Sequence, residues 1–294
     1  MYSNNYILVT PAKNEEKSLP SVIDSVLNQT ILPKLWVIVD DGSTDKTPEI
    51  LDNFSKKYEW IKVVRLPKGL RDKYLHYAYV CRVGFETAIK YCEDNKILYD
   101  FVALLDADTI LEEKYFEKLI DEFKKDPSLG IASGGIYYRK KKRLIYERTL
   151  NYPRGTGRIW SKKCFFETGG YPLDPCAHTI SDVKAILRGY KIKQFKNVVA
   201  IQTRKTNSVE GLWRSYFKGG KNAYYLYKRP AIVLLNVLHN TFKPPFYTGI
   251  AYLLGYLSAT IKRERRIQDP EVRDYFQNQK ISDTIFEFFK SLVS

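Results

Sequence analysis

Cysteine is scarce in this sequence, and no cysteine pair has the spacing of a metal site. The 294 residues include four cysteines, at the widely separated positions 81, 92, 164 and 176. Without a CxxC pair, the sequence argues against a zinc ribbon and a disulfide framework, so we expect reduced thiols. The first apolar run, residues 6–9, is only as long as a strand and lacks the charged segment of a secretory signal. We therefore expect no export and a cytoplasmic protein.

Long apolar runs are absent as well. The most apolar segments, residues 230–238 and 246–261, are shorter than the roughly 20 residues of a membrane-spanning helix. The basic run 262–266 follows them. An interfacial helical hairpin with aromatic and basic anchors fits this pattern best, and a helical cap on the sheet domain or a dimer interface are the alternatives. We expect peripheral contact with an anionic membrane, at its cytosolic face.

The change in character near residue 229 also predicts the domain organisation. We expect one domain over residues 1–228 and a C-terminal helical region over residues 229–294. The tail, residues 281–292, has the apolar spacing of a short amphipathic helix, with the same alternatives of membrane contact or packing.

Acidic residues are in the minority. The chain has 33 Asp and Glu against 48 Lys and Arg, which gives a formal net charge of +15. This balance favours an anionic partner, namely nucleic acid, acidic lipid headgroups or a phosphorylated small molecule, without choosing among them. A hydrophobic content of 44% over 294 residues suffices for a buried core, in one large or two modest domains.

Apolar runs of strand length alternate with helical patterns along the first half of the chain. Strands are predicted at residues 6–9, 36–39, 61–64 and 101–105. Helices are predicted between them, from apolar residues spaced three and four apart, at residues 19–27, 47–58 and 78–92. This alternation predicts an α/β fold with a mainly parallel central sheet flanked by helices.

Polar turns follow three of these strands. They span residues 10–16, 40–43 and 106–108. Because ligands of parallel sheets bind at the carboxyl ends of the strands, we expect the three turns to converge on one site. Taken singly, each turn has ordinary loop chemistry, since Asp, Asn and Gly favour turns. Together, and in this order, they predict a nucleotide site.

Each turn offers a different contact. Backbone groups of the first turn, with Asn14 or Glu15, could wrap a nucleotide. A carboxylate of the second turn could accept a hydrogen bond from the N–H of a pyrimidine or guanine ring. Asp106 and Asp108 follow a buried strand at positions i and i+2, where two carboxylates can share Mg²⁺ or Mn²⁺ that in turn binds a diphosphate. The alternative for this pair is a solvated turn.

Three motifs resemble those of the family 2 glycosyltransferases, which have the GT-A fold. They are VTPAKNEE at residues 9–16, VDDGSTD at 39–45 and DAD at 106–108, and the resemblance covers roughly residues 5 to 225. It implies a GT-A type nucleotide-sugar-binding fold with an additional C-terminal helical region. It also implies transfer of a sugar, with inversion at the anomeric carbon, from a nucleotide diphosphate donor to a hydroxyl or phosphate acceptor.

The resemblance assigns roles to individual residues. Asp40 and Asp41 would contact the base and ribose, Asp106 would lie near the ribose or the metal, and Asp108 would ligate Mn²⁺ or Mg²⁺. The residues expected around the donor are therefore Pro11, Ala12, Asn14, Glu15, Asp40, Asp41 and Asp106.

The family places a Glu-Asp pair after a segment that residues 165–172 resemble, and the Asp of this pair is its catalytic base. The match here is Asp182, preceded by Ser181 in place of Glu. An inverting transfer needs one general base to take the acceptor proton, and we assign this role to Asp182, with Asp174 and His178 as alternatives. Asp182 could instead stabilise a helix N-terminus. A phosphate acceptor would make a strong base unnecessary.

Basic residues of the second half have two interpretations. On residues 211–221, Arg214, Lys218 and Lys221 could offset the charge of the donor diphosphate, or could form a solvated helix face. The run 139–143 could contact acidic lipid or form a solvated hairpin. The glycine-containing loop 154–158 could cradle a phosphate, although a lone Gly-x-Gly is weak support.

Two functions from different classes follow. The first is a metal-dependent inverting glycosyltransferase that uses a nucleotide sugar and a lipid-linked or glycan acceptor. The second is a non-catalytic basic protein that binds a nucleotide sugar or nucleic acid. Nucleic-acid binding requires basic and aromatic residues on an exposed sheet, whereas helices should cover both faces here, so we expect no nucleic-acid partner. A nucleotidyltransferase is disfavoured because no glycine-rich triphosphate loop follows the first strand.

Overall fold

The computed structural model describes residues 2–68, 75–140, 143–147, 152–203, 211–242, 244–282 and 285. The chain divides into two compact units, Met1–Arg204 and Lys205–Ser294. The boundary predicted after residue 228 lies inside the second unit, and as a functional division it stays a prediction. All four cysteines are buried, and none of them forms a disulfide.

The first unit is built around one mixed sheet. Among the described residues this sheet has nine strands in the order β3-β2-β1-β4-β8-β6-β9-β5, with β7 paired to β6. The strands are β1 (Tyr6–Ala12), β2 (Leu35–Asp40), β3 (Ile61–Arg65), β4 (Phe101–Leu104), β5 (Thr109–Leu111), β6 (Leu129–Lys140), β7 (Arg143–Tyr146), β8 (Arg158–Ser161) and β9 (Lys191–Gln202).

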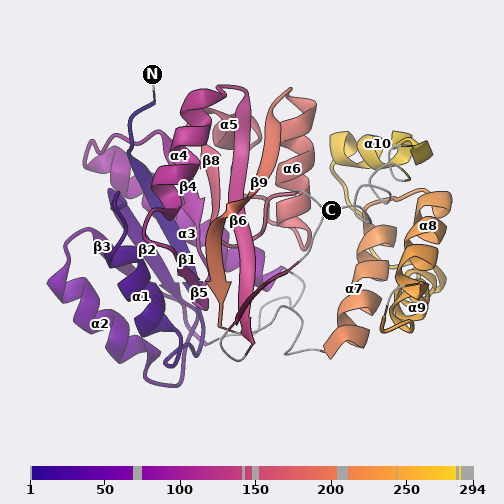
Figure 1. Cartoon of the computed structure of the whole chain (residues 1–294), viewed down its shortest axis with the longest axis horizontal. Helices are drawn as coiled ribbons and strands as arrows, with labels where there is room; N and C mark the ends of the chain where they lie inside the picture. Colours follow the sequence, from indigo (N-terminus) through magenta and orange to yellow (C-terminus); the bar gives the residue numbers. More distant parts are fainter. Residues whose placement is uncertain are drawn as a thin grey trace. The chain divides into compact units, whose positions relative to one another are not determined.

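The predicted parallel arrangement holds for the N-terminal half of the sheet. There β3, β2, β1 and β4 pair in parallel, and they alternate along the chain with α1 (Leu19–Leu27), α2 (Thr47–Lys57) and α3 (His76–Asp94). In the other half, β8 runs antiparallel to both β4 and β6, and β5 runs antiparallel to β9. The sheet as a whole is therefore mixed (Figure 1).

Helices cover both faces of the parallel strands, as predicted. Along β1, Tyr6 and Leu8 enter one core, while Ile7 and Val9 enter the other, because successive strand residues point to opposite faces. The first core includes residues of α1, α2 and α4 (Tyr115–Lys125). The second includes residues of α3, α5 (Lys162–Glu167) and α6 (Ala177–Leu187).

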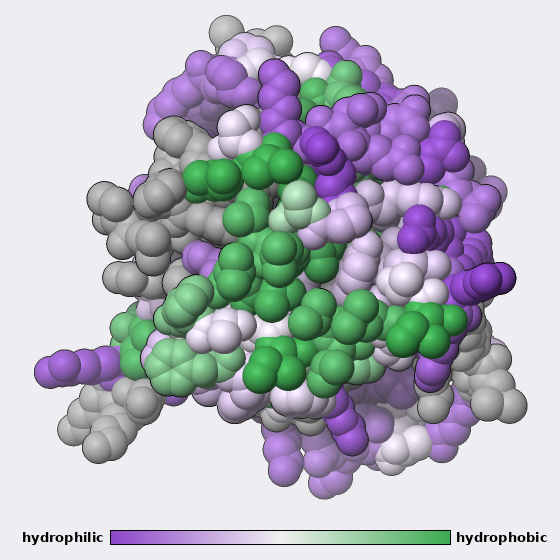
Figure 2. Space-filling view, turned by 90° about the vertical axis from the view of Figure 1, so that its right-hand side faces the viewer, coloured by the Kyte–Doolittle hydropathy of each residue, from purple (hydrophilic) through white to green (hydrophobic). Residues whose placement is uncertain are grey.

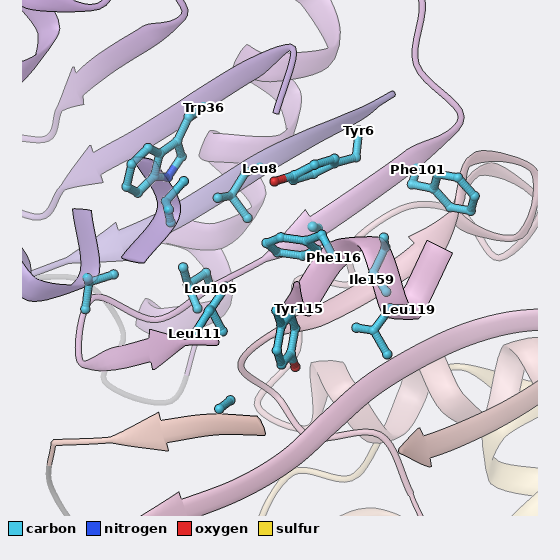
Figure 3. Close-up of a cluster of buried hydrophobic side chains, with 14 of the residues drawn as sticks. Tyr6, Leu8, Trp36, Phe101, Leu105, Leu111, Tyr115, Phe116, Leu119 and Ile159 are labelled. Atoms are coloured by element: carbon cyan, nitrogen blue, oxygen red, sulfur yellow. The ribbon is translucent and has the colours of Figure 1, made fainter. Parts of the chain in front are cut away.

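Aromatic packing stabilises the first core. The rings of Tyr6 and Phe116 lie with their centroids 4.4 Å apart, between β1 and α4 (Figure 3). The indole of Trp36 is fully buried, and its Nε1–H donates to the Thr10 hydroxyl at 2.9 Å, so its polar group is satisfied. These contacts hold the strands that carry the polar turns.

The second unit is helical. Its described helices are α7 (Gly211–Tyr225), α8 (Pro230–Thr241), α9 (Thr248–Ile261) and α10 (Pro270–Asn278). None of the helices in the described part of the chain combines the length and apolar character needed to cross a bilayer. Most of the predicted tail helix, residues 281–292, lies outside the described residues, as do residues 141 and 142 of the basic run between β6 and β7.

Candidate functional site

Three polar turns meet at the carboxyl edge of the parallel strands. The register pairs Ala12 with Asp40 and Val9 with Leu104, so the chain leaves β1, β2 and β4 at neighbouring points. A cleft of about 300 Å³ opens at this edge. It is lined by Pro11, Ala12, Lys13, Glu15, Asp41, His76, Tyr77, Val80, Asp106, Ala107, Asp108 and Gln202.

The first turn is fixed to the second by Asn14. This residue has the left-handed backbone conformation (φ +55°), which Asn adopts more readily than most residues. Its side-chain oxygen accepts from the backbone N–H of Thr44 at 2.7 Å, and its own N–H donates to the Ser43 hydroxyl at 2.9 Å. Asn14 thus connects two loops, and its predicted contact with a nucleotide stays a prediction. Glu15, one residue later, lines the cleft.

The two carboxylates of the second turn have different environments. Asp40 is buried, and it closes its own turn by accepting from the backbone N–H of Ser43 at 3.0 Å. Asp41 lines the cleft and accepts from Lys13 Nζ at 2.9 Å and from His76 Nε2 at 2.5 Å. Of the predicted pair, Asp41 is therefore the one that can contact a ligand in the cleft.

Asp106 is held by two hydrogen bonds. The Tyr77 hydroxyl donates to its Oδ1 at 2.7 Å, and its backbone N–H donates to the Thr156 hydroxyl at 2.9 Å. Burial raises the pKa of Asp106 to about 6; the Tyr77 hydrogen bond opposes this rise, and the negative charges of Asp108 and Glu15 add to it. A cation in the cleft would relieve this accumulation of negative charge.

The acidic pair fits a cation shared with a ligand. Asp106 and Asp108 both line the cleft. No group of three or more His, Cys, Asp or Glu in the described part of the chain is arranged to hold a metal. Because Mg²⁺ and Mn²⁺ need several oxygen ligands, a cation here would take its remaining ligands from a bound phosphate or from water.

The loop before β8 supports the acidic pair. The Thr156 hydroxyl, which accepts from Asp106, donates to the Thr109 hydroxyl at 3.1 Å. Gly157 has φ +62°, and a Cβ there would lie 2.3 Å from the hydroxyl oxygen of Tyr115. Tyr115 in turn donates to the Gly157 carbonyl at 2.7 Å. The suggestion that loop 154–158 could cradle a phosphate stays a prediction, and these contacts show that Thr156 and Gly157 support the acidic pair.

Asp182 lies in the second turn of α6, not at the helix N-terminus. Its carboxylate accepts a hydrogen bond from the Arg158 guanidinium, whose side chain is 0% exposed. Burial raises the pKa of Asp182 to about 6, and the positive charge of Arg158 opposes this rise. Asp182 is not among the described residues that line the cleft. Its role as the base stays a prediction.

Neither alternative to Asp182 is well suited to act as the base: His178 is a weak proton acceptor, and Asp174 holds a turn by a hydrogen bond. Burial, with a contribution from Arg158, lowers the pKa of His178 to about 3, so this imidazole is neutral and a poor base. His178 packs edge-on against the rings of Tyr77 and Tyr171. Asp174 accepts from the backbone N–H of Cys176 at 2.8 Å and so fixes the turn before α6.

The basic residues predicted for the diphosphate lie on α7. Arg214 and Lys218 belong to the second unit, and their part in donor binding stays a prediction. Lys221 forms an ion pair with Glu264 at 2.6 Å within the same unit.

Sequence reasoning missed several residues of the cleft. His76 and Tyr77 begin α3, and they reach Asp41 and Asp106 across 35 and 29 positions of sequence. Gln202 comes from the end of β9. Lys13 belongs to the predicted first turn, and its positive charge could have predicted the contact with Asp41.

The sheet and its cleft place this chain in the class of α/β proteins that bind ligands, nucleotides among them, at the carboxyl ends of adjacent parallel strands. Within that class, residues 7–195 match the sequence profile of Glycosyl transferase family 2. This match covers more than half of the chain, which therefore belongs to glycosyl transferase family 2.

Relatives of known name share this region. The chain is 31% identical over 147 residues to a poly-beta-1,6-N-acetyl-D-glucosamine synthase of Staphylococcus epidermidis, covering 50% of this chain and 32% of that protein. It is 25% identical over 222 residues to the protein of the same name from Staphylococcus aureus, covering 68% of this chain and 50% of that one. The chain thus spans no more than half the length of these relatives.

Solved structures confirm the GT-A fold. A mannosyltransferase from Pyrobaculum calidifontis, solved with GDP-Man and Mn²⁺, has a TM-score of 0.54 at 14% identity, covering 98% of this chain and 86% of that one. Residues 1–349 of S. aureus TarS, solved with UDP-GlcNAc, have a TM-score of 0.53 at 14% identity, covering 98% and 79%. At these identities the likeness concerns the fold alone.

Proposed function

We propose that this chain transfers a sugar from a nucleotide diphosphate donor to a glycan or lipid-linked acceptor, by a single displacement that inverts the anomeric carbon. The observation that carries the proposal is the meeting of Asp41, Asp106 and Asp108 at one cleft in a family 2 chain. The relatives support the donor class, since the solved structures hold UDP-GlcNAc and GDP-Man, and the sequence relatives are named N-acetyl-D-glucosamine polymer synthases.

The base and ribose of the donor bind at the first two turns. Asp41 accepts a hydrogen bond from a ring N–H of the base, and Lys13 and His76 hold this carboxylate in place. Asp40 supports Asp41 by closing the turn, and Pro11 and Ala12 provide the wall of the cleft. In the unliganded chain, Lys13 and His76 satisfy a carboxylate that burial would otherwise penalise.

Asp106 and Asp108 would hold a divalent cation, with a bound phosphate or water completing its ligands. The raised pKa of Asp106 would favour exchange of its proton for the cation near neutral pH. When bound, the cation offsets the charge that develops on the departing diphosphate. Mn²⁺ in the mannosyltransferase complex supports this choice of metal for the family.

Asp182 takes the proton of the acceptor hydroxyl. Ionisation of this buried carboxylate needs a nearby positive charge, which Arg158 provides. A pKa of about 6 suits a general base that works near neutral pH. The enzyme acts as a peripheral protein at the cytosolic face of a membrane.

A donor-binding protein without turnover is the second candidate. The observation that favours it is the direct engagement of Asp182 by Arg158, which would weaken Asp182 as a proton acceptor. Binding and turnover must therefore be measured separately.

Calorimetric titration with UDP and GDP, with and without Mn²⁺, tests the donor site. We expect micromolar binding of one nucleotide, lost on addition of EDTA and lost in Asp108→Ala. Equal binding with and without metal would remove the cation from the proposal. Hydrolysis or transfer assays with UDP-GlcNAc and GDP-Man then test turnover, and tight donor binding without product would favour the second candidate.

A further inference from the structure

Large apolar side chains cover the outer surface of α8 and α9. Figure 2 shows a continuous patch of hydrophobic residues on this face of the molecule. We name as the apolar face the exposed residues Leu234, Leu238, Phe242, Phe246, Tyr247, Ile250, Leu254, Leu257 and Ile261. Contiguous exposed patches of this kind on soluble proteins usually mark an interaction site.

Helix α9 leaves several of its large apolar side chains on its outer face. Its inner face buries Tyr252 together with small residues, including Ala251 and Ala259, which are at most 1% exposed. Its outer face carries Leu254, Leu257 and Ile261, which are 44%, 42% and 80% exposed. A helix that serves only as a cap points its large apolar residues inward. The exposed leucines and isoleucine indicate that the outer face contacts something apolar.

Two glycines fix the orientation of α9 within its unit. A Cβ at Gly220 of α7 would lie 1.9 Å from the Tyr252 carbonyl oxygen, and a Cβ at Gly255 would lie 1.9 Å from the Phe217 carbonyl oxygen. The backbones of α7 and α9 are therefore in close contact at these glycines, and no larger residue fits at the crossing. Because this packing prevents rotation of α9, its exposed large residues stay on the outer face.

The charges around the apolar face favour a negatively charged partner. Residues 230–261 contain no Asp or Glu and only one Lys. At the end of α9, Lys262, Arg263 and Arg265 are exposed. Basic residues next to an exposed apolar stripe are the pattern of a helix that lies in the headgroup region of an anionic bilayer.

The length of α9 determines how it can meet a bilayer. Its 14 residues extend about 21 Å, whereas the hydrocarbon core is about 30 Å thick. The helix can therefore lie along the membrane–water interface, but it is too short to cross the hydrocarbon core. The ring centroids of Trp213 in α7 and Tyr247 lie 6.1 Å apart. Aromatic pairs with a polar group, like this one, are common at membrane–water interfaces.

We infer that the apolar face binds one leaflet of an anionic lipid bilayer, with its apolar side chains at the acyl boundary and the basic residues after α9 among the headgroups. This inference names the surface and the lipid class behind the peripheral location proposed above. Membrane binding through this face requires no sugar transfer, so it can be tested without a known substrate.

Flotation with lipid vesicles tests the inference on the full chain. The vesicles are phosphatidylcholine alone, or phosphatidylcholine with one third phosphatidylglycerol. We expect the chain to float with the anionic vesicles. Leu254→Gln with Leu257→Gln should lower the partition coefficient about tenfold or more, because two apolar side chains no longer enter the lipid. Lys262→Gln with Arg263→Gln should lower binding to anionic vesicles by a similar factor.

The matched control replaces two exposed leucines of the first unit. Leu32→Gln with Leu98→Gln changes side chains that are 44% and 79% exposed, and it should leave flotation unchanged. Circular dichroism and UDP titration of every variant report folding and the donor site independently. The inference is overturned if the wild-type chain does not bind anionic vesicles, or if both leucine pairs reduce binding equally. A dimer that dissociates in Leu254→Gln with Leu257→Gln, without vesicle binding, would make the face a protein interface.

Discussion

The guanidinium of Arg158 donates a hydrogen bond to the carboxylate of Asp182 in the interior of the first unit. The cation comes from β8, and the anion comes from α6, which packs beside the sheet. Neither side chain is solvated, since their exposed fractions are 0% and 10%. Each charge therefore depends on the other, and removal of either partner leaves a buried charge unpaired.

Loss of the Arg158 charge should destabilise the first unit. We expect Arg158→Gln to lower the free energy of unfolding at pH 8 by about 3–5 kcal/mol, because Asp182 is then buried and ionised without a partner. The pKa of Asp182 should rise further, since Arg158 is the group that lowers it. Denaturant unfolding at pH 5 and pH 8 measures this effect, and the loss should be smaller at pH 5, where Asp182 takes up a proton.

Two controls separate the buried pair from charge in general. Arg82→Gln removes one side of an exposed pair with Glu86, and it should cost less than about 1 kcal/mol. Arg158→Met with Asp182→Leu removes both charges together and should recover most of the stability. A double variant as unstable as Arg158→Gln would show that the pair contributes packing rather than charge.

The assignment of Asp182 as the base predicts a separation of binding from turnover. Asp182→Asn keeps the size of the side chain and an oxygen for Arg158, so donor affinity should be unchanged. The rate of transfer should fall by a factor of order 100 or more. Full activity in this variant would move the base elsewhere or indicate a phosphate acceptor.

The same assignment predicts the acid limb of the rate profile. The base works only when ionised, and burial raises the pKa of Asp182 to about 6, so the rate should fall as the pH decreases through about 6. The free energy of unfolding should change in the opposite direction. Because the pKa of Asp182 is higher in the folded chain than in the unfolded chain, ionisation of Asp182 should lower the stability as the pH rises from about 4 through about 6. Rates and unfolding measured over this range in wild type and Asp182→Asn distinguish the two effects.

The parallel strands β1 to β4 were predictable from sequence, whereas the short antiparallel strand β8 was not. Strands β1 and β2 are apolar runs between clear turn residues, so local pattern is sufficient. Strand β8 has only four residues and begins with Arg158, which resembles a solvated loop residue when the chain is read locally. Its place between β4 and β6 depends on pairings across many positions of sequence.

The residues of the candidate site were also predictable only where the local sequence carried the signal. Asp41, Asp106 and Asp108 were predicted because each follows a strand end, and parallel strand ends meet. His76, Tyr77 and Gln202 were missed because helix starts and distant strands carry no local mark of the cleft. A charge directly before the apolar residues Ile159 and Trp160 was the one signal that could have revealed the buried Arg158, since a buried cation requires an anionic partner.

Substitution of Asp41 and substitution of Asp108 should change nucleotide binding in different ways. Asp41→Asn weakens the acceptor for a ring N–H and releases Lys13 and His76, so the affinity for the nucleotide should fall about tenfold or more. The dependence of the remaining binding on Mn²⁺ should persist, because the acidic pair is intact. Asp108→Ala should remove the metal dependence itself. Titrations of both variants with and without Mn²⁺ check this, and identical behaviour would contradict separate base and metal regions.

Proton binding at Asp106 should compete with the cation. Burial raises the pKa of Asp106 to about 6, so Mn²⁺-dependent donor affinity should be constant above this pH and fall up to tenfold per pH unit below it. Tyr77→Phe removes a hydrogen bond that lowers this pKa, so it should move the midpoint to higher pH. Tyr58→Phe changes a tyrosine that packs on the first core and does not line the cleft, so it is the matched control and should leave the midpoint unchanged. A midpoint near 4 in the wild-type chain would contradict a raised pKa for Asp106.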